Sequence, residues 1–308
     1  MKRFLLGILL AAMAGASAAQ TPVPAAKPTR PIPAIEHVLI IAVDGLRPDR
    51  LLLAEAPVLR RLMAQGSYTM WARTTPLANT LPSHVSMLTG ATPRRHKILW
   101  NDPLPFKEPV YPAVPTLFAR AHEAGYSTAL VTGKSKFTPL NQPGSLDYVR
   151  IPAETDKSDV AVTTDAVRII HQLRPEVMGV FLPEVDEVGH DFGWGSAEQL
   201  AAIGRVDQAI GRIFTALDET GLRASTLIII SSDHGGAGKT HVMEDERSRT
   251  IPWIISGPGV KHGYDLTQVA DLLVRTEDTC ATVCYVLGLS LPANLEGRSI
   301  AAAFSSAP

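Results

Sequence analysis

The sequence contains few cysteines and no excess of basic charge. Cys280 and Cys284 are its only cysteines, and they lie four residues apart in a segment that we expect to be helical. Two cysteines one turn apart on a helix rarely reach disulfide geometry, so we interpret both as small apolar core residues with no metal-binding or catalytic role. The net charge of −1 gives no indication of a nucleic-acid-binding surface or of attraction to an anionic membrane.

Long hydrophobic runs are also absent beyond the first residues. Met1-Lys2-Arg3 is followed by an apolar run over residues 4–14 and by the small residues Ala16-Ser17-Ala18. This order is typical of a cleaved signal peptide, which we assign to residues 1–19. The run is shorter than the roughly 20 apolar residues of a membrane-spanning helix. We therefore expect no membrane span after cleavage and a periplasmic or secreted protein.

The remaining sequence predicts a proline-rich linker over residues 20–34 and one catalytic domain over residues 35–308. Apolar runs that are typical of buried strands occur at residues 37–43, 127–132, 177–182, 226–231 and 253–256. Helix-like segments lie between them at residues 55–65, 116–124, 159–173, 196–219 and 276–287. This alternation predicts an α/β fold with a mostly parallel central sheet and helices on both faces.

Aspartate and histidine residues follow three of the predicted strands. Asp44 follows the first strand, Asp186 and His190 follow the third, and Asp233 and His234 follow the fourth. Because ligands bind at the carboxyl ends of parallel strands, we expect these side chains to lie at one edge of the sheet. Carboxylate and imidazole ligands without thiolate favour zinc, with manganese, iron or calcium as alternatives. A helix N-cap is the alternative role of a strand-end aspartate such as Asp44.

Thr80 precedes a short segment that begins Leu-Pro-Ser-His and ends at Gly90. This pattern predicts a helix with Thr80 at its N-terminus, where backbone N–H groups and the helix dipole favour an anion. A simple N-cap is the structural alternative. A threonine hydroxyl is a weak nucleophile and requires a base or a metal ion for activation. No histidine is placed in the sequence as an obvious base, so we expect activation by a metal.

Other candidate ligands lie close to these residues in the sequence. Glu184 and Glu187 flank Asp186 and compete with it for the role of ligand. His241 follows the loop that contains Asp233 and His234, and two histidines in one short loop beside an aspartate favour a functional role.

Together these segments resemble the alkaline phosphatase superfamily and, within it, the type I phosphodiesterase/nucleotide pyrophosphatase group. The segments that carry the resemblance are Val43-Asp44-Gly45, Thr80-Leu-Pro-Ser-His with Thr89-Gly90, Trp100-Asn101-Asp102, Asp186 with His190, and Ser232-Asp233-His234-Gly235. The resemblance covers nearly the whole chain after residue 35. It implies an alkaline-phosphatase-like fold, two divalent metal ions with Zn²⁺ as the expected metal, and a small-molecule phosphate ester as substrate. It also implies hydrolysis of phosphodiester or pyrophosphate bonds through a phosphothreonine intermediate.

The resemblance further assigns a role to each matching residue. It places Asp186, His190 and His241 around one metal ion, and Asp44, Thr80, Asp233 and His234 around the other. Thr80 is then the nucleophile, and Asn101 donates an amide N–H to a non-bridging oxygen of the transferred phosphoryl group. His262 is the alternative to His241, because the corresponding histidine of nucleotide pyrophosphatases lies far downstream of the Asp-His pair.

Two lysines leave other functions open. Lys134 and Lys136 resemble the lysine-bearing segment with which sulfatases and some threonine-type phosphatases bind the substrate anion, although a solvated lysine pair is the simpler interpretation. If they point inward, a phosphomonoesterase is the alternative function. A sulfatase is disfavoured because Thr80 cannot supply a formylglycine. A non-catalytic metal- or phosphate-binding protein on the same fold is the remaining alternative.

Overall fold

The computed structural model describes residues 27–102, 109–152, 157–241 and 244–305. The predicted signal peptide, residues 1–19, lies outside this part of the chain, as do residues 20–26 of the predicted linker. The rest of that linker contacts the domain instead of extending away from it. Lys27 pairs with Glu176 at 2.6 Å, and Ile32 packs against the hydrophobic core. The division into signal peptide, linker and catalytic domain stays a prediction.

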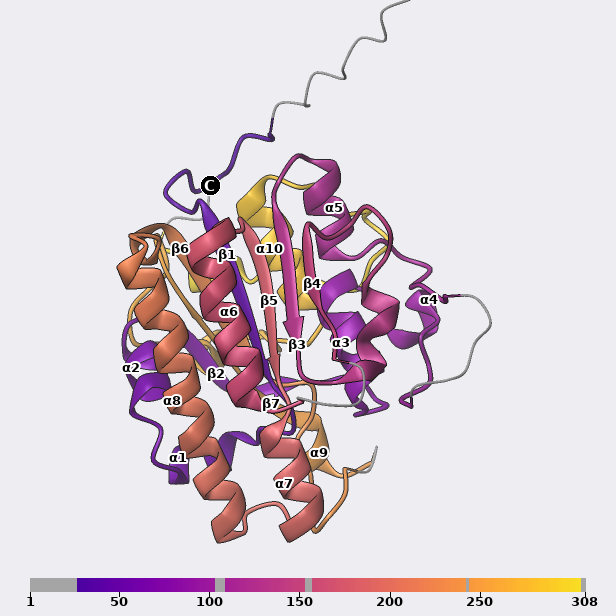
Figure 1. Ribbon diagram of the computed structural model, residues 1–308, viewed down its shortest axis with the longest axis vertical. Helices are drawn as coiled ribbons and strands as arrows, with labels where there is room; N and C mark the ends of the chain where they lie inside the picture. Colours follow the sequence, from indigo (N-terminus) through magenta and orange to yellow (C-terminus); the bar gives the residue numbers. More distant parts are fainter. Residues whose placement is uncertain (1–26, 103–108, 153–156, 242–243, 306–308) are drawn as a thin grey trace, which may run out of the picture.

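The centre of the described chain is an eight-stranded sheet with the order β4-β3-β5-β1-β6-β7-β2-β8 (Figure 1). Its strands are β1 (His37–Val43), β2 (Ser67–Arg73), β3 (Thr128–Thr132), β4 (Tyr148–Arg150), β5 (Val177–Leu182), β6 (Thr226–Ser231), β7 (Thr250–Ser256) and β8 (Tyr264–Asp265). Only β7 runs against its neighbours, pairing antiparallel with β6 and β2 within the described chain. The mostly parallel sheet predicted from the sequence is therefore confirmed.

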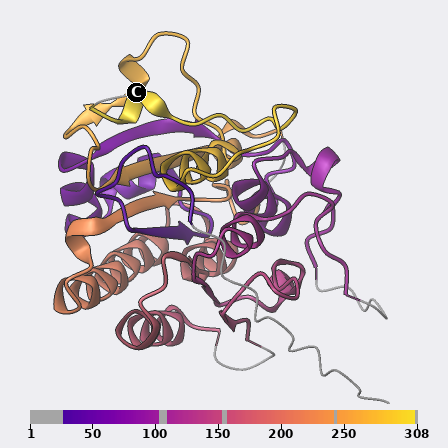
Figure 2. The same cartoon turned by 90° about the horizontal axis from the view of Figure 1, so that it is seen from above.

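Helices cover both faces of this sheet (Figure 2). One face carries α1 (Pro48–Leu53), α2 (Pro57–Ala64), α6 (Asp159–Leu173), α7 (Glu184–Phe192) and α8 (Ala197–Glu219), and the other carries α3 (Thr80–Thr89), α5 (Leu117–Glu123) and α10 (Asp278–Leu287). The short helices α4 (Pro93–His96) and α9 (Glu246–Arg249) lie beside α3 and β7. Alternate residues of β1 divide between the two faces: Leu39 and Ile41 pack with α6 and α8, while Val38 and Ile40 pack with α3 and α10. Burial on both faces explains why the central strands are continuous apolar runs.

The two cysteines belong to this core, as predicted. Cys280 and Cys284 are buried on α10 with their sulfur atoms 4.0 Å apart and no disulfide between them.

The strand order brings the candidate functional residues together. Strands β5, β1 and β6 are neighbours and all run in the same direction, so their carboxyl ends share one edge, which is the edge nearest α7 in Figure 1. Asp44 follows β1, α7 begins directly after β5, and Asp233 follows β6. Two loops and the first turn of α7 therefore supply carboxylates to the same space.

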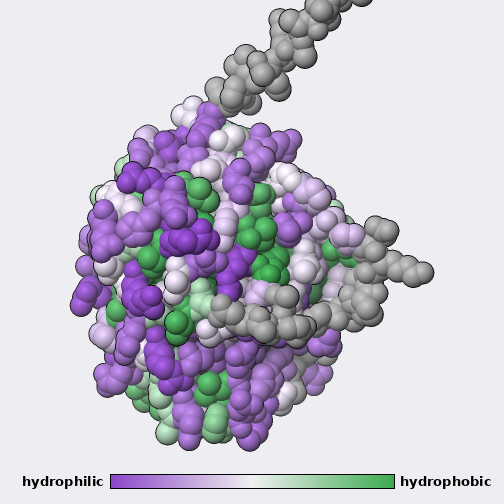
Figure 3. Space-filling view, viewed as in Figure 1, coloured by the Kyte–Doolittle hydropathy of each residue, from purple (hydrophilic) through white to green (hydrophobic). Residues whose placement is uncertain are grey.

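The outer face over α6 and α8 is mainly hydrophilic, with hydrophobic residues in small groups (Figure 3). Within the described ranges, no helix combines the length and the apolar character that a membrane span requires.

Candidate active site

Close backbone packing holds the segments that carry Asp44, Asp186 and Asp233 together. Gly45 has a φ of 72°, and a Cβ atom at this position would lie 2.9 Å from Cα of Asp186. Only glycine therefore tolerates both this backbone conformation and the contact with α7. Its N–H donates to Oδ1 of Asp233 at 3.2 Å. Gly45 thus fixes Asp44 beside Asp186 and Asp233.

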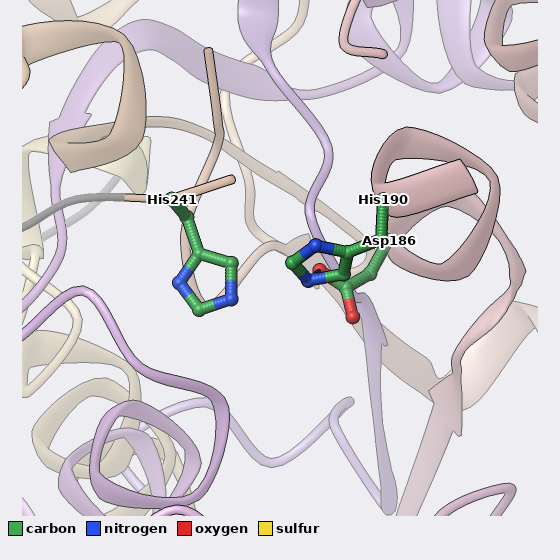
Figure 4. Close-up of side chains that lie close together, drawn as sticks. All are labelled: Asp186, His190 and His241. Atoms are coloured by element: carbon green, nitrogen blue, oxygen red, sulfur yellow. Dashed lines mark ion pairs between the residues drawn. The ribbon is translucent and has the colours of Figure 1, made fainter. Parts of the chain in front are cut away.

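Carboxylate and imidazole side chains lie close together at the carboxyl ends of β1, β5 and β6. His234 Nε2 lies 3.4 Å from Oδ1 of Asp44, 3.9 Å from Oδ1 of Asp186 and 3.3 Å from Oδ2 of Asp233. The same Oδ1 atom of Asp186 lies 3.4 Å from Nε2 of His190. Two groups each have their ligand-type atoms within 4.8 Å of one another: Asp186, His190 and His241, and Asp44, Asp186 and His234. Figure 4 shows Asp186 and His190 on α7 facing His241, which comes from a different loop.

Three oxygen atoms of this cluster are unsatisfied. Oδ1 of Asp44, Oδ1 of Asp186 and Oδ2 of Asp233 are buried and have no hydrogen-bond partner within the described chain. An unpaired buried acceptor is costly, and a coordinated cation is one means of satisfying it. All three atoms face the imidazole of His234. The donor set therefore fits a divalent metal centre, and its oxygen and nitrogen ligands suit zinc.

Backbone carbonyl groups orient the histidines. Nδ1 of His190 lies 3.0 Å from the carbonyl oxygen of Lys239, and Nδ1 of His241 lies 2.8 Å from that of Ala78. Nδ1 of His234 lies 2.8 Å from the carbonyl oxygen of Gly235. Since a carbonyl can only accept, each neutral ring carries its proton on Nδ1 and turns an Nε2 lone pair toward the cluster. This tautomer is the one in which an imidazole binds metal through Nε2.

Thr80 begins α3, as the sequence predicts, and is buried beside the same cluster. Its hydroxyl oxygen lies 3.2 Å from Nε2 of His234. The carboxamide oxygen of Asn101 accepts a hydrogen bond from the N–H of Leu81 at 3.0 Å. This bond fixes the Asn101 amide next to the N-terminus of α3 and leaves its NH₂ group as the donor for another partner.

Lys134 points into the cluster, a direction that the sequence left open. Its ammonium nitrogen lies 2.6 Å from Oδ2 of Asp44 and 2.6 Å from Oδ2 of Asp186. Lys136 is partly buried, and burial together with the charge of Lys134 lowers its pKa. The simpler interpretation of a solvated pair is therefore wrong for Lys134.

The pKa values of Asp44 and Asp186 shift in opposite directions. Burial, reinforced by Asp186 and Asp233, raises the pKa of Asp44 to about 7. Burial also disfavours the charged form of Asp186, but the ammonium of Lys134 and the nearby imidazole of His190 hold its pKa well below the usual range. The carboxylates of Asp44 and Asp186 share the one ammonium of Lys134, and Asp233 lies beside them without a lysine contact in the described chain, which favours the binding of further cations.

The structure distinguishes the alternative ligands. The ring of His241 stacks on that of His234 at a centroid distance of 3.8 Å. His262 is exposed in the turn before β8, at the opposite edge of the sheet from the cluster. Glu184 pairs with Arg205 at 2.5 Å on the outer side of α7. The chain therefore brings His241, and not His262 or Glu184, to the other ligand-type residues.

Sequence reasoning gave no role to His84. This residue is buried, with Nδ1 2.9 Å from the carbonyl oxygen of Thr80 and 3.5 Å from Oδ2 of Asp233. Its ring packs against Phe137 and Phe181. The four-residue spacing between Thr80 and His84 on a predicted helix is the signal that would have placed them on one face.

Solved structures of other proteins share this architecture. Human ectonucleotide pyrophosphatase/phosphodiesterase 5 superposes with a TM-score of 0.71 at 14% identity, covering 88% of this chain and 100% of that chain. A 2-O GAG sulfatase superposes with a TM-score of 0.69 at 18% identity, covering 89% of this chain and 73% of that chain. At such identities the similarity establishes the fold, which is alkaline-phosphatase-like.

The sequence comparison narrows this class. Residues 38–247 match the model of the type I phosphodiesterase/nucleotide pyrophosphatase family, and the chain belongs to that family. An uncharacterised pyrophosphatase/phosphodiesterase of Schizosaccharomyces pombe is 27% identical over 216 residues, which is 65% of this chain and 44% of the relative. The chain spans less than half the length of the curated relatives it matches.

Proposed function

We propose that this protein hydrolyses phosphodiester or pyrophosphate bonds of small molecules with two divalent metal ions, zinc being the expected metal, and with Thr80 as nucleophile. The observation that carries the proposal is the position of the Thr80 hydroxyl. It lies at the N-terminus of α3 and 3.2 Å from Nε2 of His234, within the cluster of carboxylates and imidazoles. The family membership of the chain supports the same reaction class.

The ligand residues divide between two ions. Asp186, His190 and His241 would hold one ion, and Asp44, Asp233, His234 and Thr80 would hold the other. Oδ1 of Asp186 also lies 3.9 Å from Nε2 of His234. When bound, such ions lower the pKa of a coordinated hydroxyl and neutralise charge on phosphate oxygens. The buried acceptors without hydrogen bonds support this ligand assignment.

The protein groups account for the remaining steps. Thr80 Oγ1 attacks phosphorus in line with the leaving group, so that its bond to phosphorus forms as the bond from phosphorus to the leaving-group oxygen breaks. The N-terminus of α3 favours the developing negative charge. The NH₂ group of Asn101 donates to a non-bridging oxygen, since its carboxamide oxygen is held by Leu81. Attack by water on the phosphothreonine then releases phosphate or phosphomonoester and restores the Thr80 hydroxyl.

Phosphomonoester hydrolysis is the second candidate, and one observation favours it. The partly buried ammonium of Lys134 lies within the cluster, and Lys136 is two residues away. A phosphate monoester carries one more negative charge than a diester and gains more from additional cations. Lys134 and Lys136 are the substrate-binding residues in this alternative.

A matched pair of aryl phosphate monoester and diester substrates separates the candidates. We expect a higher kcat/KM for the diester, and accumulation of enzyme that carries one arylphosphoryl group on Thr80 when diester turnover is quenched with acid. A higher kcat/KM for the monoester would select the phosphatase. Binding of metal and phosphate without turnover of either substrate would select the non-catalytic binding protein on this fold.

A further inference from the structure

Lys134 contacts one carboxylate that is common to the two groups of candidate ligands, Asp186, and one that belongs to a single group, Asp44. Its Nζ atom lies 2.6 Å from Oδ2 of Asp44 and from Oδ2 of Asp186. The opposite oxygen of each carboxylate, Oδ1, faces Nε2 of His234 and has no hydrogen-bond donor. Each aspartate therefore presents one oxygen to the ammonium and the other to the imidazoles.

The backbone fixes the position of this lysine. A Cβ atom at Gly133 would lie 2.5 Å from Cγ of Pro183, the residue that precedes α7. The N–H of Lys134 donates to Oγ1 of Thr132 at 3.2 Å, at the end of β3. The start of the Lys134 side chain is thus held against the start of α7, where Asp186 lies.

An ammonium in this place opposes the binding of divalent cations. It neutralises part of the charge of both carboxylates, and it repels an ion that approaches their other oxygens across a buried space. We propose that Lys134 is an internal competitor of the metal ions, whose paired ammonium sets the affinity of this centre for divalent metals. This inference rests on the proposed metal-dependent function and goes beyond the role of Lys134 as a phosphate-binding group.

The test compares the affinity of metal-depleted full-length variants for Zn²⁺, measured by competition with a chromogenic chelator. Lys134→Met removes the charge and keeps most of the side-chain volume. Without the ammonium, the negative charges of Asp44 and Asp186 have no positive partner at this position. We therefore expect this variant to bind Zn²⁺ about tenfold or more tightly than wild type. We also expect its metal-depleted form to have a lower Tm than wild type, and Zn²⁺ to reverse this difference.

Two variants serve as controls. Lys134→Arg keeps the charge, and we expect its affinity for Zn²⁺ to stay within about threefold of wild type. Lys136→Met removes the same charge two residues away, and we expect a change smaller than about threefold because the ion pairs of Lys134 remain. If Lys134→Met does not fold, Lys134→Gln carries the same expectation, since its neutral amide still donates to the carboxylates.

An affinity of Lys134→Met equal to or weaker than that of wild type would overturn the inference while leaving the metal-dependent function intact. Zinc binding by Lys134→Met but not by wild type would support the inference and contradict the proposed function of the wild-type chain. Absence of zinc binding in every variant would overturn both.

Discussion

The hydroxyl oxygen of Thr80 lies 3.2 Å from Nε2 of His234. Because Nδ1 of the same ring faces the carbonyl oxygen of Gly235, Nε2 is the atom that presents a lone pair. The Thr80 hydroxyl can therefore donate to His234 or share a cation with it, and both arrangements make the oxygen more nucleophilic. This contact connects the N-terminus of α3 with the loop after β6, and these two segments are far apart in the sequence.

Metal removal provides a direct test of the ligand assignment. We expect chelators to inactivate the enzyme and Zn²⁺, or failing that Mn²⁺, to restore it, because the ligands are carboxylates and imidazoles. His190→Ala and His234→Ala are expected to lower the metal content, each by affecting a different ion. Full activity in protein shown by elemental analysis to be free of metal would contradict the assignment.

The choice between two histidines yields a separate prediction. We expect His241→Ala to lose metal and activity, since its ring stacks on His234 and lies with Asp186 and His190. His262→Ala is the matched control, because His262 is exposed at the opposite edge of the sheet. Metal content measured on both variants decides the assignment. A metal-poor His262 variant beside an unaffected His241 variant would reverse it.

Substrate preference tests the role of the two lysines. At saturating metal, the proposal predicts a higher kcat/KM for an aryl diester than for the matching monoester. In the Lys134→Ala/Lys136→Ala variant, we expect monoester hydrolysis to fall more than diester hydrolysis, because the monoester has the extra charge. A wild-type monoester preference that disappears selectively in this variant would support the phosphatase instead.

A buried carboxyl outside the cluster predicts a pH dependence of stability. Burial, followed by the charge of Glu184, raises the pKa of Asp159 from 3.8 to about 8. Between these values the folded protein keeps a proton that the unfolded chain loses, so the contribution of Asp159 to stability falls as pH rises. Asp159→Asn removes this fall of stability with pH and retains an acceptor for the N–H of Glu184.

Urea unfolding at two pH values measures this effect. We expect Asp159→Asn to match wild type near pH 4 and to be more stable above pH 8 by roughly 1 kcal/mol or more. The exposed Asp218→Asn is the control for a general change of charge. Equal pH dependence of wild type and Asp159→Asn would show that Asp159 ionises alike in both states.

Much of the site follows from strand ends in the sequence. The apolar runs that became β1, β5 and β6 could be recognised because both faces of these strands are buried, and each directs its next polar residue to one edge. Thr80 at the start of α3 could be predicted because proline and glycine bound that helix. Strand β2, which lies between β7 and the short edge strand β8, was not predicted, since its residues alternate between buried and partly exposed positions and lack a continuous apolar run.

Other features depend on side-chain direction, which the sequence does not specify. In the sequence Lys134 cannot be distinguished from a surface lysine; in the structure Gly133 packs against Pro183, and the ammonium of Lys134 pairs with Asp44. His84 becomes part of the site because Phe137 and Phe181, from distant segments, enclose its ring. Such contacts are set by the tertiary arrangement of β3, β5 and α3.

The measurement that tests the central claim most directly is the kcat of Thr80→Ala with its metal content. Because Thr80 is the proposed nucleophile and only one of several ligands, we expect a loss of several orders of magnitude in kcat, a wild-type fold and most of the metal retained. Thr80→Ser, which keeps a hydroxyl, is expected to preserve the acid-stable phosphoryl adduct that Thr80→Ala lacks. Retention of a tenth of the wild-type kcat by Thr80→Ala, a barrier change of only about 1.4 kcal/mol, would contradict the account.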